Sequence, residues 1–358
     1  MGRSGTRCGL SGGGLYRILI LVLATLAGCG YKLGPPDVIY GEAEPMILVQ
    51  PSTDARRWYV PVESETLGPQ IFFFDTGYGY TACDDDLVEG LGLTTKGRVI
   101  VRGELGALRA TKTRLPPMKI GGHTVNNVTC QVRDIGGTSS INDPREVPVA
   151  GVIGMDVLRQ FRLILDPEHG VIHLVEPDKA VRLDRKADDV VSMRREWFGL
   201  RSKVPLSVGD KTTWPLLDTG STTTWIDGKR LGLEISRLQE GVAFRGTGKT
   251  TTDVRTMYYY DLPQVAIGSH ATGNTTLTDR RKGPFEPGLL GLNVARLYKQ
   301  ELDFRRELAR YTRVEPMDIS TWGRWHRDGQ GVGGGVLLDG GSAAVSEVPF
   351  TVGDQNGE

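Results

Sequence analysis

The chain has 358 residues, a length that suits two domains or two lobes better than a single core. Its 43 basic and 43 acidic side chains give a formal net charge of zero, which argues against nucleic acid or an acidic lipid surface as the main partner. Glycine (48) and proline (19) are abundant, but 24% charged and 39% hydrophobic residues are typical of a globular protein. We therefore expect many turns and short strands rather than disorder.

The N-terminus contains a processing signal. Basic residues precede the hydrophobic run 18–27, which is too short to span a bilayer and ends in LAGC at 26–29. This order resembles a bacterial lipoprotein signal, in which the cysteine becomes the lipidated first residue. We predict a signal peptide over 1–28, lipidation at Cys29 and a tether over 29–45, so that the protein contacts a membrane of the cell envelope and faces the periplasm or exterior. In the alternative, the signal peptide is an ordinary one and Cys29 is incidental.

The chain then repeats itself. Asp-Thr-Gly occurs at 75–77 and again 143 residues later at 218–220, each time after a hydrophobic segment. Three further landmarks follow in the same order in both halves: EGLGLTT and KRLGLEI (89–95 and 229–235), RLPPMKIGG and DLPQVAIGS (114–122 and 261–269), and two hydrophobic segments that contain Gly (150–166 and 287–303). We predict an N-terminal lobe over 46–180, a C-terminal lobe over 181–315 and a glycine-rich tail over 316–358.

The predicted elements are mostly strands. Hydrophobic and β-branched segments alternate with Gly and Pro, which favours hairpins, and glycine ends the few short helical patterns. In chain order we expect a strand over 71–74, a short helix over 84–93, a hairpin over 99–113, a strand entering a short helix over 151–161, a strand-turn-strand over 163–174 and a hairpin over 242–256. The fold class is therefore mainly β, with two similar β-barrel-like lobes and a few short helices.

An aspartate follows the four hydrophobic residues 71–74, and its partial burial needs a partner or a shared proton. A single Asp-Thr-Gly is a common turn sequence, since both Asp and Gly favour turns. Two copies at the same place in a repeated unit favour a paired site instead, with Asp75 and Asp218 facing each other.

The segments FDTGYGYT (74–81) and LDTGSTTTWI (217–226) resemble the aspartic peptidases. Each is followed by Leu-Gly-Leu and later by VIGMDVL or LLGLNVA. The resemblance covers roughly 55–313 and is strongest to the bacterial retropepsin-like proteins, although two lobes on one chain are also similar to pepsin. It implies an acid-protease fold and an aspartic endopeptidase that acts on a peptide or protein substrate. Because one chain supplies both loops, we expect a monomer, and we expect no cofactor and no metal.

The resemblance also assigns roles. Asp75 and Asp218 would be catalytic: they would share one proton and activate a water, one acting as general base and the other as general acid. Supporting residues carried over from the family are Thr76 and Thr219, which would bond across the lobes, Gly77 and Gly220, which would permit the tight turns, and Ser221, which would donate a hydrogen bond to Asp218. The hairpins over 99–113 and 242–256 are candidates to cover the cleft.

Two features leave alternatives open. Tyr78 stands where the family usually has Ser or Ala, so the second hypothesis is a catalytically inactive lipoprotein that binds peptides or proteins on the same fold. Cys83 and Cys130 lie in the same half, and in an exported protein they form either a disulfide or two buried thiols. His169 and His173 have the spacing of some zinc sites, but their turn and strand setting favours a surface turn and a strand residue.

Overall fold

The computed structural model describes residues 35–47, 49–50, 58–66, 68–103, 106–135, 149–196, 199–244, 252–279, 288–316 and 323–324. These residues belong to one compact unit that begins at Pro35. The predicted signal peptide, Cys29 and most of the glycine-rich tail lie outside the described residues. Among the residues that are described, no helix is both long and hydrophobic enough to cross a bilayer.

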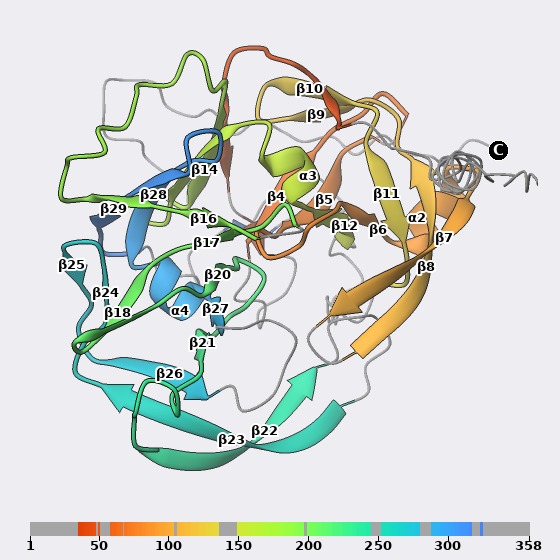
Figure 1. Cartoon of the computed structure of the whole chain (residues 1–358). Helices are drawn as coiled ribbons and strands as arrows, with labels where there is room; N and C mark the ends of the chain where they lie inside the picture. Colours follow the sequence, from red (N-terminus) through yellow and green to blue (C-terminus); the bar gives the residue numbers. More distant parts are fainter. Residues whose placement is uncertain are drawn as a thin grey trace, which may run out of the picture. The chain divides into compact units, whose positions relative to one another are not determined.

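The fold is mainly β, as predicted, and its largest sheet carries the first Asp-Thr-Gly loop (Figure 1). In spatial order the strands of this nine-stranded sheet are β30 (Gly323–Arg324), β3 (Val49–Gln50), β4 (Tyr59–Val62), β5 (Gln70–Phe74), β12 (Val149–Ile153), β6 (Ala82–Cys83), β11 (Thr129–Val132), β8 (Gly106–Arg114) and β7 (Lys96–Gly103). β5 and β12 are parallel, as are β6 and β11, whereas β12 and β6 are antiparallel.

The second half of the chain builds an eight-stranded sheet on the same plan. Its strands, in spatial order, are β16 (Arg194–Arg195), β17 (Ser202–Lys203), β20 (Leu216–Leu217), β27 (Gly288–Leu290), β21 (Trp225–Ile226), β26 (Thr275–Asp279), β23 (Thr252–Leu262) and β22 (Arg237–Phe244). β20 and β27 are parallel, β21 and β26 are parallel, and β27 and β21 are antiparallel. The sequence repeat is therefore a repeat of strand order and direction.

A six-stranded sheet joins the two halves, because β13 of the first pairs with β28 of the second. In spatial order it contains β15 (Val190–Ser192), β29 (Leu308–Arg313), β28 (Tyr298–Asp303), β13 (Arg162–Asp166), β14 (Val171–Val175) and β2 (Pro45–Ile47). Two small sheets complete the β structure: β1 (Asp37–Ile39), β10 (His123–Asn126) and β9 (Met118–Ile120), and β19 (Lys211–Thr213), β18 (Leu206–Val208), β24 (Ala266–Ile267) and β25 (His270–Ala271). β1 lies within the segment predicted to be a tether.

The expectation of barrel-like lobes needs correction. The two large sheets are open: among the described residues, the end strands β30 and β7 do not pair with each other, and neither do β16 and β22. Closure depends on how end strands meet in space, and local sequence patterns carry no information about that. The predicted hairpins are present as β7–β8 and β22–β23, both with antiparallel pairing.

The hydrophobic run before Asp75 is explained by burial on both faces of β5. Phe72 and Phe74 pack in the main core of the molecule, whereas Ile71 and Phe73 pack in a second cluster with Tyr59. Alternate residues of a strand point to opposite faces, so a strand buried on both sides reads as a continuous hydrophobic segment. β5 is thus held between two layers, and it delivers Asp75 at its end.

Three short helices complete the description, and one matches the predicted helix over 84–93. α2 (Asp85–Gly90) begins with Asp84 as its N-cap, whose side chain accepts a hydrogen bond from the Asp86 amide at 3.2 Å. α3 (Met155–Leu158) and α4 (Leu292–Ala295) occupy equivalent places in the two halves, each after a glycine, Gly154 or Gly291. A side chain at Gly154 would lie 2.6 Å from the Tyr80 carbonyl carbon, so only glycine fits between the helix and the loop.

Candidate active site

Each Asp-Thr-Gly loop begins where a buried strand ends beside a parallel neighbour. The Asp75 amide, directly after β5, donates to the Ile153 carbonyl of β12 at 3.1 Å. The Asp218 amide, directly after β20, donates to the Leu290 carbonyl of β27 at 3.0 Å. The two aspartates are therefore held by the same backbone bond in equivalent positions.

The structure brings the carboxyl groups of Asp75 and Asp218 together. The Gly77 amide donates to Asp75 Oδ1 at 2.7 Å, and the Gly220 amide donates to Asp218 Oδ1 at 2.9 Å. A Cβ atom at Gly77 would overlap the Asp218 carboxyl group, and one at Gly220 would overlap that of Asp75. Each glycine thus packs against the carboxyl group of the opposite half, where only a hydrogen atom fits.

Burial and mutual repulsion control the protonation of this pair. Burial raises the pKa of Asp218 well above its usual value, and the charge of Asp75 and a hydrogen bond between the two carboxyl groups raise it further. The Gly220 amide and the positive charge of Arg201 lower the pKa, but by less than burial and the charge of Asp75 raise it. The pair therefore retains a proton at a pH at which an isolated aspartate would be ionised.

Thr76 and Thr219 connect the two loops through hydrogen bonds that run between the halves. Each threonine amide donates to the hydroxyl of the other, at 3.0 Å from Thr76 and 3.1 Å from Thr219. The Thr76 hydroxyl donates to the Leu217 carbonyl at 3.0 Å, and the Thr219 hydroxyl donates to the Phe74 carbonyl at 2.8 Å. Both side chains are buried, so loss of either hydroxyl would leave the other half's amide without a partner.

A second polar network lies behind each loop. In the first half Asp156 Oδ1 accepts from the Thr81 amide at 2.9 Å and from the Thr81 hydroxyl at 2.8 Å. In the second half Asn293 Oδ1 accepts from the Thr224 amide and hydroxyl, both at 2.7 Å. Asp156 and Asn293 were not predicted from the sequence, although both follow a glycine by two residues in the repeated hydrophobic segment.

The predicted hydrogen bond from Ser221 to Asp218 is wrong. Its hydroxyl donates to the Thr223 carbonyl at 2.7 Å rather than to Asp218. A serine hydroxyl has a single proton to donate, and a carbonyl two residues away offers a low-strain local partner.

Tyr78 occupies the position of Ser221 without changing the loop. The Tyr78 amide donates to the Asp75 carbonyl at 3.3 Å, just as the Ser221 amide donates to the Asp218 carbonyl at 3.2 Å. The Tyr78 hydroxyl donates to Gln131 Oε1 at 3.3 Å, and the Arg133 guanidinium lies 5.1 Å from the centre of the ring. The ring also packs against the second hydrophobic cluster, so the phenol bonds and stacks beside the loop.

Cys83 and Cys130 form a disulfide, which decides between the two alternatives that the sequence left open. Their Cα atoms are 5.8 Å apart, and they lie on the neighbouring parallel strands β6 and β11. β6 follows the first Asp-Thr-Gly loop, and β11 carries Gln131. The disulfide therefore fixes the two strands that flank Tyr78.

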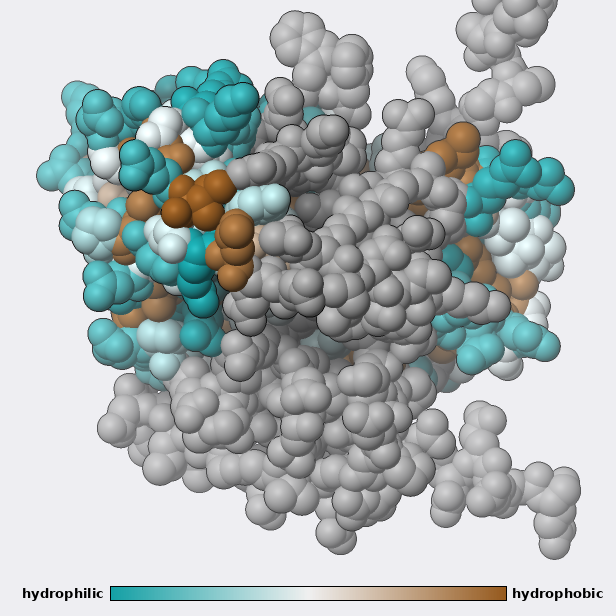
Figure 2. All heavy atoms as spheres, turned by 90° about the horizontal axis from the view of Figure 1, so that it is seen from below, coloured by the Kyte–Doolittle hydropathy of each residue, from teal (hydrophilic) through white to brown (hydrophobic). Residues whose placement is uncertain are grey.

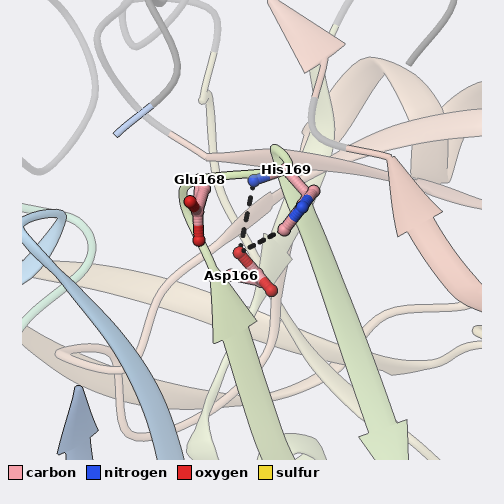
Figure 3. A group of neighbouring side chains, drawn as sticks. All are labelled: Asp166, Glu168 and His169. Carbon is pink, nitrogen blue, oxygen red and sulfur yellow. Dashed lines mark hydrogen bonds and ion pairs between the residues drawn. The ribbon is translucent and has the colours of Figure 1, made fainter. Parts of the chain in front are cut away.

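Two groups of acidic and histidine side chains are close enough to consider as metal sites. In the first, His169 donates from its amide to Asp166 Oδ1 at 3.2 Å, and its ring Nδ1 lies 3.1 Å from the same oxygen, beside Glu168 (Figure 3). Lys299 Nζ binds the other Asp166 oxygen at 2.7 Å. Burial alone would raise the pKa of Asp166, but the bonds from Lys299 and His169 lower it. These bonds already neutralise the carboxylate.

The second group contains Asp84, Asp85 and Asp134. Both carboxylate oxygens of Asp84 are already used, since Oδ1 accepts from the Asp86 amide and Oδ2 accepts from the Ile135 amide at 2.8 Å. Asp84 therefore serves as a helix cap and anchors the loop at Ile135.

Few large hydrophobic side chains are exposed among the described residues. Figure 2 shows one face, on which hydrophobic residues form small groups between hydrophilic ones. The exposed large hydrophobic side chains are Ile39, Tyr80, Ile100, Val181, Ile235 and Leu238. Tyr80 belongs to the first Asp-Thr-Gly loop, whereas Ile100 and Leu238 lie on β7 and β22 of the two hairpins expected to cover the cleft.

A family model described as aspartyl protease matches residues 60–157 and 204–294, which together are more than half of the chain. Each matched segment contains one Asp-Thr-Gly loop and ends within the short helix α3 or α4. No curated protein matched the chain. On the strength of this match, the chain belongs to the aspartyl protease family.

Proposed function

We propose that the protein is an aspartic endopeptidase that hydrolyses peptide bonds with a water held between Asp75 and Asp218. The observation that carries this proposal is the packing of each carboxyl group against the glycine of the opposite Asp-Thr-Gly loop. The raised pKa of Asp218 supports it, because general acid and general base chemistry need one protonated and one ionised carboxyl group at the same time.

The proposed reaction has two stages. The ionised carboxylate takes a proton from the water while the water oxygen bonds to the carbonyl carbon of the substrate. The protonated carboxyl group gives its proton to the carbonyl oxygen. The resulting tetrahedral diol then collapses. The carboxyl group that took the water proton gives it to the amide nitrogen, the other carboxylate takes a proton from a diol hydroxyl group, the C–N bond breaks, and an acid and an amine leave. The two aspartates titrate as a coupled pair, so we assign these roles to the pair rather than to either residue.

The alternative is an inactive peptide- or protein-binding protein, for which Tyr78 was the argument. Its phenol is directed to Gln131, and the backbone of its loop keeps the bonds found in the second loop. Tyr78 therefore gives no structural reason for the loss of activity, and we favour the enzyme.

We also propose that the protein is exported and held at a membrane of the cell envelope by lipid on Cys29. The order of basic residues, hydrophobic run and LAGC supports this. Growth with a labelled fatty acid should label the parent protein but not Cys29→Ser, and equal labelling of both would contradict the proposal.

The decisive experiment measures cleavage of a diverse peptide library across a broad pH range by the parent protein, Asp75→Asn and Asp218→Asn. We expect each variant to lose at least about a thousandfold in kcat/KM, because each removes one partner of the acid–base pair. Asp178→Asn, which changes an exposed aspartate, is the matched control and should cleave like the parent. Folding is checked by thermal unfolding, and parent-like cleavage by either site variant would exclude the mechanism.

A further inference from the structure

Arg201 belongs to the second half of the chain but contacts the first Asp-Thr-Gly loop. It precedes β17 directly, and its Nη1 atom donates to the Gly77 carbonyl at 3.3 Å. Its positive charge also acts on Asp218, whose pKa it lowers against the effect of burial. One guanidinium group thus contacts the loop that presents one aspartate and acts electrostatically on the other.

Glu196 holds this guanidinium in a fixed orientation. Arg201 Nε lies 2.9 Å from Glu196 Oε2 and Arg201 Nη2 lies 2.6 Å from Glu196 Oε1, which is a two-point pairing of a planar cation with a carboxylate. Such a pair fixes direction as well as distance. A Cβ atom at Gly199 would overlap Glu196 Oε2, so a side chain there would displace the carboxylate that holds Arg201.

The hairpin that carries the pair is anchored to both halves of the molecule. The Glu196 amide donates to the Arg201 carbonyl at 3.0 Å across the β16–β17 hairpin. Arg159, which follows α3 in the first half, donates to the Leu200 carbonyl at 2.7 Å and to the Phe304 carbonyl at 3.4 Å. The Arg201 side chain is only 17% exposed, so the surrounding chain restricts its movement.

We propose that Arg201, held by Glu196, is a positioning residue that keeps the first Asp-Thr-Gly loop seated against Asp218. The proposal rests on the proposed peptidase function for its kinetic consequences, but its geometry is independent of them. Among the described residues, Arg201 pairs with Glu196 on its own hairpin, and its charge acts on Asp218 of the site. Loss of the guanidinium releases the Gly77 carbonyl and removes a positive charge that acts on Asp218.

The test compares Arg201→Gln, Arg201→Lys and Glu196→Gln with the parent. Arg201→Gln should lower kcat about ten- to a hundredfold with little change in KM, because a small displacement of a reacting group has an effect of this order. Its pH–rate profile should move upward by about half a pH unit or more, because a positive charge near the pair has been lost. Arg201→Lys should keep the profile but lose kcat, since an ammonium group lacks the two-point geometry. Glu196→Gln should lower kcat without moving the pH–rate profile upward.

Arg305→Gln is the matched control, because Arg305 forms a comparable but exposed ion pair with Asp178 away from the site. It should match the parent in rate and profile. A parent-like kcat and pH profile in a folded Arg201→Gln would overturn the proposal.

A second readout separates this proposal from the proposed function. Carbon NMR of the labelled aspartate carboxyl groups reports the titration of the pair without any substrate. An upward shift in Arg201→Gln supports the positioning role even where the parent cleaves nothing, in which case only the peptidase proposal fails. An unchanged titration together with an unchanged Gly77 carbonyl signal would refute the role of Arg201 whatever the activity.

Discussion

The two halves of the molecule present their aspartates on the same backbone but stabilise the surrounding strands differently. In the first half, the disulfide between Cys83 and Cys130 joins β6 to β11. The strand registers place Ile226 and Leu277 at the equivalent positions of β21 and β26, where both are fully buried. A covalent link in one half thus stands where the other half has hydrophobic packing.

The networks behind the loops differ in charge. Asn293 is permanently neutral, and its amide donates to the Thr276 carbonyl at 2.9 Å while its oxygen accepts from Thr224. Asp156 is the equivalent residue in the first half, and burial raises its pKa to about 6 despite the hydrogen bonds from Thr81. The comparison teaches that the loop needs a hydrogen-bond acceptor at this position, while the rest of the side chain is free to differ. Because Asp156 titrates and Asn293 does not, only the first half is sensitive to pH at this position.

The largest expected effect comes from the disulfide. Cys83→Ala with Cys130→Ala should lower the free energy of unfolding by about 4 kcal/mol, the entropic value for the 47-residue separation that the bond closes. Urea unfolding of the oxidised parent and the double variant measures this difference. Replacement of both cysteines by valine should lower the free energy of unfolding by less, because two hydrophobic side chains would then pack as they do at the equivalent positions of the second half. Equal midpoints for the parent and the alanine variant would show that the disulfide does not stabilise the fold.

The next effect is a pH dependence. Between pH 3.8 and about 6 the native state keeps the proton on Asp156 that the unfolded chain releases, so stability falls as the pH rises through this window. Asp156→Asn should remove about 3 kcal/mol of this fall in the free energy of unfolding, the value that corresponds to a rise in pKa from 3.8 to about 6. Urea unfolding at a series of pH values measures the slope.

A reciprocal variant supplies the control for this pH effect. Asn293→Asp places the same carboxyl group in the second half. It should steepen the fall of the free energy of unfolding with pH, whereas Asp156→Asn should flatten it. Asp218 contributes a dependence of the same sign in every variant, so only the differences between slopes are interpreted. Identical slopes for Asp156→Asn and the parent would contradict the assignment.

Local sequence predicted the parts of this site that depend on neighbours in the chain. The hydrophobic run before Asp75, the helix capped by Asp84 and the two hairpins each follow from periodicity and turn residues. The pairing of β13 with β28 could not be predicted, since it joins segments far apart in the sequence and neither pattern specifies the other. Arg201 was missed for the same reason, because its contact with Gly77 exists only after the β16–β17 hairpin has folded.

The Ser221 error has a different physical origin. The sequence correctly placed a short hydroxyl beside Asp218, but the choice between two nearby acceptors depends on the direction of the hydroxyl, and the Thr223 carbonyl received it. Competition of this kind between side-chain and backbone acceptors is decided by the local geometry of the loop. The residue type predicts that a hydrogen bond forms but not where it goes.

The smallest effect is expected where the loops differ most in appearance. Tyr78→Phe removes a single 3.3 Å hydrogen bond to Gln131 and keeps the packed ring, so the free energy of unfolding should fall by less than about 1 kcal/mol. Ser221→Ala in the other half removes an equally local bond and should behave alike. Because neither hydroxyl bonds to the aspartate pair, kcat/KM of both variants should stay within about threefold of the parent, a change of less than about 1 kcal/mol in the activation free energy. A loss of tenfold or more in Tyr78→Phe alone would mean that the phenol acts within the cleft, and the equivalence of the two loops would then extend only to their backbones.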